Sequence, residues 1–129
     1  MKSRESVARL KQFQVEDKRR QVNQIEAMMA DFDRMARELD EQIESEERRT
    51  GIDDASHFAY STFAKSAAQR RDNLVASVAD LREQLEAAQA DLAEAEEELG
   101  KVEQLVERER LALEQSGDSV DDNRQRAAG

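Results

Sequence analysis

The sequence contains no cysteine, no proline and no tryptophan, and only four of its 129 residues are glycine. Without cysteine the chain forms neither disulfides nor thiolate metal sites, and it fits a reducing compartment. Without proline, no residue obliges a helix to kink or stop. Aromatic residues make up only 4%, too few to fill a compact core with large side chains. These absences argue for a long buried seam between helices instead of a globular core.

Long apolar runs and chemical motifs are absent as well. No segment approaches the ~20 apolar residues that span a bilayer, and Met1–Glu5 has no apolar region of a secretion signal. We therefore expect a cytoplasmic protein with no direct membrane insertion. There is no glycine-rich phosphate loop and no Ser/His/Asp or Cys/His set, and His57 is the only histidine. We expect no enzymatic activity, no catalytic residue, no metal and no cofactor.

What the sequence does contain is charge, unevenly distributed. Charged residues make up 39% and the net charge is −10. Residues 1–20 have seven Lys/Arg and three Asp/Glu, whereas residues 80–115 have four and twelve. An acidic chain is a poor partner for phosphates, so we expect no nucleic acid as a partner. The asymmetry is better explained by contact between the two oppositely charged segments.

Two seven-residue repeats predict two long coiled-coil helices. In the first, expected over 3–49, the apolar positions are Val15, Val22, Met29, Ala36 and Ile43, followed three residues later by Lys18, Ile25, Phe32 and Leu39. In the second, expected over 54–114, they are Val78, Leu85, Leu92, Leu99, Val106 and Leu113, with Leu74, Leu81, Ala88, Ala95 and Val102. Residues 55–69 fit this repeat poorly. Before Val15 the apolar spacing changes, which indicates either altered winding or a frayed end.

A helix-ending signal separates the two repeats. Gly51 is suited to the left-handed position that ends a helix, and Asp53 or Asp54, with Ser56 as an alternative, can cap the next one. We therefore expect a turn at 50–53 and antiparallel helices. Residue i would then face roughly residue 103 − i, which opposes basic and acidic segments. The expected pairs are Arg4–Glu98, Arg9–Glu94, Lys11–Asp91, Lys18–Glu86 and Arg20–Glu83.

These features predict an all-α fold, a two-helix antiparallel coiled-coil hairpin over 1–115 with a disordered tail over 116–129. The second helix is the longer, so residues beyond about 102 would have no partner within the chain. Their apolar residues would then be frayed or would bind another protein.

Three aromatic residues, Phe58, Tyr60 and Phe63, follow the turn beside His57. A two-helix tip buries one or two such rings, so we expect at least one to be partly exposed. They either anchor a partner or lock the turn by local packing. A strip of methionines, Met28, Met29 and Met35, is either an adaptable binding surface or part of the seam.

The layout resembles the flagellar export protein FliJ family. The likeness rests on the size, on Leu10-Lys11-Gln12-Phe13 in a basic first helix, and on Gly51-Ile52 followed by the aromatic segment 57–63. This segment, His-Phe-Ala-Tyr-Ser-Thr-Phe, is similar to the family's Trp-x-Asn-Tyr-x-x-Phe. His57 and Ala59 depart from that pattern, which has Trp and Asn there.

The resemblance implies a role in bacterial flagellar type III protein export. It implies a stalk-like coiled coil whose partners are the hexameric export ATPase, the cytoplasmic domain of the export-gate membrane protein, and export chaperones, at the cytoplasmic face of the inner membrane. It implies a gate contact through Phe58, Tyr60 and Phe63. The ATPase ring would be contacted by the open end of the hairpin, through Val7, Leu10, Phe13, Leu105, Val106, Leu111 and Leu113. The alternative is a structural coiled-coil scaffold that oligomerises through this open end.

Overall fold

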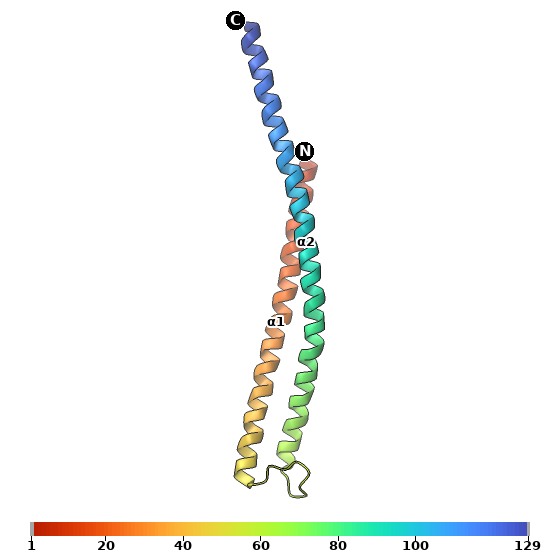
Figure 1. The fold of residues 1–129 in the computed structure, drawn as a ribbon, viewed down its shortest axis with the longest axis vertical. Coiled ribbons are helices and arrows are strands. Elements are labelled where there is room, and N and C mark those ends of the chain that lie inside the picture. Colours follow the sequence, from red (N-terminus) through yellow and green to blue (C-terminus); the bar gives the residue numbers. More distant parts are fainter. Residues whose placement is uncertain (1, 129) are drawn as a thin grey trace. The chain divides into compact units, whose positions relative to one another are not determined.

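A computed structural model describes the backbone of residues 2–128 and the side chains of residues 3–117. Two helices follow in chain order, α1 (Lys2–Thr50) and α2 (Thr62–Ala128), joined by residues 51–61 (Figure 1). The part of the chain so described has no strand. The fold is the predicted all-α antiparallel two-helix coiled-coil hairpin.

The hairpin divides into two units, which we describe separately. Residues 20–89 form one unit, which includes the connection between the helices, and we call it the connection unit. Residues 1–19 and 90–129 form the other, the terminal unit.

The connection unit has a well-buried seam. Its buried apolar residues are those of the predicted repeat and two alanines before it: Val22, Ala36, Leu39, Ile43, Ala64, Ala67, Val78, Leu81 and Ala88. Leu39, Ile43, Ala64 and Ala67 form one cluster. The expectation that residues 55–69 fit the repeat poorly is correct for residues 55–61, which lie outside the helices, and wrong for the beginning of α2, where Ala64 and Ala67 continue the repeat. Alanine has too little apolar surface to mark a seam in the sequence, yet it lets two helix backbones approach closely.

The terminal unit has a thinner seam. Among its described residues only Val15 and Ala95 are buried apolar residues. Ala8 and Lys11 are half-buried, whereas Val7, Leu10 and Phe13 are exposed. The prediction that the packing between the helices changes before Val15 is therefore wrong. The repeat continues through an alanine and a lysine, and the apolar residues lie off the seam.

The connection between the helices is longer than predicted, which shifts the register. It covers residues 51–61 instead of 50–53. With α1 ending at Thr50 and α2 beginning at Thr62, residue i faces roughly residue 112 − i. The basic segment does face the acidic one, but with other partners than expected: the observed pairs are Arg4–Glu109, Lys11–Glu98 and Arg19–Glu96.

The helical backbone of α2 continues past Glu114, the end expected from the sequence, to Ala128. Gly100 lies inside this helix without interrupting it. The side chains are described only as far as Gly117. The predicted disordered tail, 116–129, thus lies almost entirely outside the described side chains.

Candidate functional site: the connection and the exposed apolar residues

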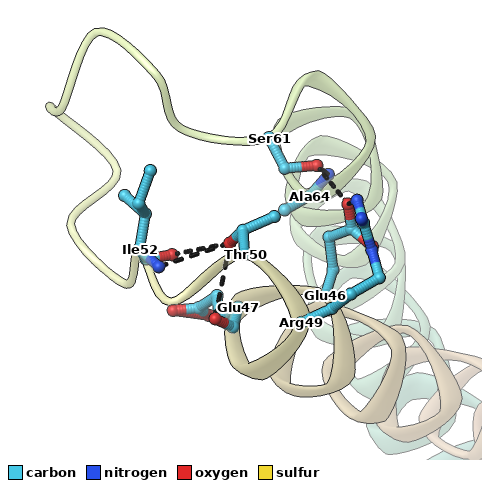
Figure 2. Close-up of polar contacts among 7 residues, drawn as sticks. All are labelled: Glu46, Glu47, Arg49, Thr50, Ile52, Ser61 and Ala64. Carbon is cyan, nitrogen blue, oxygen red and sulfur yellow. Dashed lines mark hydrogen bonds and ion pairs between the residues drawn. The ribbon is translucent and has the colours of Figure 1, made fainter.

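The C-terminus of α1 ends in the predicted glycine. Gly51 has a φ of 73°, in the left-handed region, and its N–H donates to the Glu47 carbonyl at 2.9 Å. This bond satisfies a carbonyl that the helix end would otherwise leave without a partner. The Thr50 hydroxyl lies between the Glu47 carbonyl and Ile52, whose N–H donates to it at 3.3 Å (Figure 2). The chain therefore leaves α1 in a fixed direction.

The N-cap of α2 is Ser61, not the predicted Asp53, Asp54 or Ser56. Its hydroxyl oxygen accepts a hydrogen bond from the Ala64 N–H at 3.2 Å, as an N-cap residue does for the third helical residue. The same hydroxyl donates to the Glu46 carboxylate of α1 at 3.0 Å (Figure 2). Arg49 also binds this carboxylate. Glu46 therefore links the last turn of α1 to the cap of α2.

The charge on Glu46 is stabilised by this arrangement. The Arg49 guanidinium, with a smaller contribution from the Ser61 hydroxyl, holds the pKa of Glu46 below its ordinary value. The Glu46 side chain is only 16% exposed, so the contact lies at the hairpin interface of this unit, not in open solvent.

Asp54 builds the connection instead of capping α2. Its carboxylate accepts hydrogen bonds from the Ser56 N–H at 2.9 Å and the Ser56 hydroxyl at 2.7 Å, and these bonds lower the pKa of Asp54. This is an Asx turn. Two further turns follow, closed by His57 N–H to the Asp54 carbonyl and Tyr60 N–H to the His57 carbonyl, each at 3.0 Å. Hydrogen bonds thus order the connection without proline.

The three aromatic residues after the predicted turn, two in the connection and Phe63 in α2, occupy different environments. Phe58 is 96% exposed, and its ring stacks on that of His57 with 4.7 Å between the centroids. His57 Nδ1 in turn accepts the Ala59 N–H at 3.0 Å, which holds the imidazole in place. Phe58 is therefore an exposed ring on an ordered support.

Tyr60 lies inward. It is half-buried against the cluster of Leu39, Ile43, Ala64 and Ala67, and burial, followed by the nearby Glu47 charge, raises its pKa. Phe63, 56% exposed, lines a shallow groove on α1 with Glu38, Gln42 and Glu46. The expectation that at least one of the three rings is partly exposed is confirmed. The two interpretations divide by residue: Tyr60 packs locally, whereas Phe58 and Phe63 are open to solvent.

The predicted apolar end residues lie in the terminal unit, and most are exposed. They are Val7 at 42%, Leu10 at 55%, Phe13 at 64%, Leu105 at 42%, Leu111 at 46% and Leu113 at 50%. Val106 differs, since it is half-buried and lines a groove with Ala8 and Arg9 of α1. Val106 is therefore part of the contact between the helices and is not an unpartnered residue.

The expectation that α2 has no partner within the chain beyond residue 102 is wrong for residues 103–109, which α1 contacts as far as Glu109. Arg4 of α1 binds Glu109 at 2.6 Å. The longer connection explains this, because it brings the beginning of α1 opposite residues of α2 that lie about nine positions further along than a four-residue turn would. Leu111 lies two residues past Glu109, and Leu113 lines a small groove with Glu5 of α1.

The three methionines of the predicted strip also differ in burial. Met29 is half-buried in the seam of the connection unit, whereas Met28 and Met35 are exposed. Met35 lines a groove with Leu74 and Ser77 of α2.

Sequence reasoning missed the role of Ser61 and the polar contacts that set the register. Arg71 of α2, half-buried at a seam position, donates to Asp40 of α1 at 2.9 Å. This contact, together with Asp72, raises the pKa of Arg71. The signal was present in the repeat, since Arg71 lies seven residues before Val78, but a charged residue at a seam position is easily taken for an interruption.

Within the described part of the chain, no group of His, Asp or Glu residues could hold a metal ion, and no helix is long and apolar enough to cross a membrane. The exposed apolar side chains described above lie on ordered backbone and are suited to contacts with another protein. No family model, no curated protein and no solved structure matches this chain.

Proposed function

We propose that this chain is a non-enzymatic stalk and adaptor of the bacterial flagellar type III protein export apparatus. In this role it links the hexameric export ATPase to the export gate and assists export chaperones, at the cytoplasmic face of the inner membrane. The observation that favours this function most is Phe58, a 96% exposed ring held by hydrogen-bonded turns. Exposed aromatic anchors on rigid supports are typical of protein contacts.

The gate contact is assigned to the connection and the first turn of α2. Phe58 and Phe63 present accessible rings, and Tyr60 acts by positioning them through its packing on the core cluster. The ATPase-ring contact is assigned to the exposed residues of the terminal unit, namely Val7, Leu10, Phe13, Leu105, Leu111 and Leu113. Val106 supports this surface from the seam.

The gate assignment is tested with the full chain and the purified cytoplasmic domain of the export gate. Phe58→Ala and Phe63→Ala should each weaken binding by about tenfold, the usual effect of removing an aromatic anchor, and leave the helicity unchanged. Val75→Ala, which truncates an exposed apolar residue on α2, is the matched control and should bind normally. Failure of the unaltered chain to bind either the gate domain or the ATPase, together with normal motility of a deletion strain, would refute the proposal.

The second candidate function is a structural scaffold that oligomerises through its open end. The exposed leucines of the terminal unit favour it, because they are unusual on an acidic helix. Sedimentation equilibrium distinguishes the two functions. A chain that is monomeric at high micromolar concentration cannot be such a scaffold.

A further inference from the structure

The terminal unit has two long faces beside its seam, and they differ in chemistry. One face bears a shallow groove lined by Gln14 and Lys18 of α1 and by Asp91, Glu94 and Glu98 of α2. The other bears a groove lined by Glu5, Arg9, Gln12, Glu103 and Glu107, with Ala8 and Val106 at its base. Both grooves are lined mainly by polar and charged side chains.

The first face becomes apolar one heptad closer to the N-terminus of α1. A coiled-coil helix repeats its direction every seven residues. Seven residues before Gln14 and Asp17 of this groove lie Val7 and Leu10, and seven residues after Glu98 lies Leu105. The Lys11–Glu98 ion pair, at 2.9 Å, connects the two helices at this level.

Val7, Leu10 and Leu105 therefore form one apolar surface built from both helices, which we call the two-helix patch. All three are between 42% and 55% exposed, and Val102 lies half-buried beneath them at the seam. Phe13 lies on the outer side of α1, because it is two residues from each of the seam positions Lys11 and Val15 and therefore faces away from the seam.

The charges around the patch are basic, in a chain whose net charge is −10. The heptad places Lys101 and Arg108 on this face of α2, seven and fourteen residues after Glu94. The carboxylates nearby are already paired: Glu98 binds Lys11 and Glu109 binds Arg4. Lys101 is 71% exposed, and its contact with Glu97 is at 3.5 Å on the helix surface. The cations Arg4, Lys11, Lys101 and Arg108 outnumber the carboxylates Glu97, Glu98 and Glu109 by one, so the local excess of charge is positive.

We propose that the two-helix patch binds an amphipathic α-helix of another protein that has carboxylates beside its apolar stripe. A groove between two antiparallel helices accepts a third helix, whose apolar residues at helical spacing cover Val7, Leu10 and Leu105. Its Asp or Glu residues then lie near Lys101 and Arg108. A second copy of this chain fits less well, because two copies of the patch would oppose like charges. The inference does not depend on the flagellar assignment.

The test uses the full chain and two synthetic helical peptides, each three heptads long. Both have leucine at the seam positions, and the flanking positions are glutamate in one and lysine in the other. The acidic peptide should bind the unaltered chain, and Leu10→Asp should weaken this binding by tenfold or more, since one buried leucine contributes about that factor. Met28→Asp, at an exposed residue on the same helix in the other unit, is the matched control and should bind like the unaltered chain.

Reversing the charges beside the two-helix patch distinguishes binding at this patch from nonspecific hydrophobic binding. Lys101→Glu with Arg108→Glu should weaken binding of the acidic peptide and strengthen binding of the lysine peptide, with circular dichroism confirming that the helices persist. The inference is overturned if the acidic peptide does not bind, if the two peptides bind equally well, or if Met28→Asp weakens binding as much as Leu10→Asp. Self-association of the unaltered chain that Leu10→Asp abolishes would also overturn it, because the patch would then be covered by a second copy.

Discussion

Gly51 and Gly100 both have open space around them, but their backbone conformations differ. No atom lies within 4 Å of a Cβ added at either position. Gly51 has a φ of 73°, whereas Gly100 is helical. Any effect of adding a methyl group therefore comes from the backbone conformation and not from a clash.

We predict that Gly51→Ala and Gly100→Ala change stability in opposite directions. Gly51→Ala should lower the free energy of unfolding by about 1 kcal/mol, because a left-handed conformation is strained for alanine. Gly100→Ala should raise it by about the same amount, because alanine is the better helix former. Urea titration followed by circular dichroism measures both. If Gly51→Ala left the free energy of unfolding unchanged, residue 51 would not have the left-handed conformation that ends α1.

Glu46 predicts a specific dependence of stability on pH. Its pKa in the folded chain lies below the ordinary value of 4.5, chiefly because of Arg49. Its contribution to stability is therefore complete above pH 4.5 and is lost as the pH falls below 4.5 through the folded-state pKa. Glu46→Gln should lower the melting temperature at pH 7, and this difference should shrink toward pH 3.

Glu44→Gln is the control, since Glu44 is an exposed residue of the same helix. It should leave the melting temperature nearly unchanged at both pH values. A difference between the unaltered chain and Glu46→Gln that stayed constant down to pH 3 would mean that the carboxylate charge is not what joins α1 to Ser61.

At the scale of elements, the seam could be read from the sequence wherever its residues are large and apolar. Val15, Val22, Leu39, Ile43, Val78 and Leu81 were predicted at the seam and are buried. The repeat could not be followed through Ala8, Lys11, Ala64 and Ala67, because small or charged residues look the same at a seam as on a solvated face.

The length of the connection could not be predicted for a related reason. An aspartate followed two residues later by serine fits both a helix cap and an Asx turn. Asp54 forms the turn, and Ser61 is the cap. Eight residues that the sequence predicts for the second helix, 54–61, therefore belong to the connection. The resulting shift gives Arg4 and Lys11 other ion-pair partners than predicted.

The unequal seams predict unequal local stability. The connection unit has nine buried apolar residues, whereas the described part of the terminal unit has Val15 and Ala95. Amides of residues 5–17 should exchange at least about tenfold faster than those of residues 36–46, because fewer buried contacts oppose local opening. Hydrogen exchange with mass spectrometry measures both segments.

Fraying of a chain end would speed exchange only at the beginning of α1. Residues 95–105 of α2, which face that segment, should therefore exchange faster than residues 78–88 as well. Uniform exchange along α2 would show that the seam of the terminal unit is as stable as that of the connection unit.

At the scale of the whole molecule, each unit contributes a different surface. The connection unit presents Phe58 and Phe63, and the terminal unit presents exposed leucines beside basic residues. Two chemically distinct surfaces on one hairpin suit a protein that joins two partners. The sequence alone does not indicate which of the apolar residues are exposed.

The most direct test of the proposed function is the stoichiometry of the complex with the flagellar export ATPase. Native mass spectrometry of the purified chain mixed with the assembled hexameric ATPase measures it. A stalk occupies the centre of a ring, so we predict one copy of the chain per ring. The absence of a complex, or one copy bound to every ATPase subunit, would contradict the stalk and adaptor function.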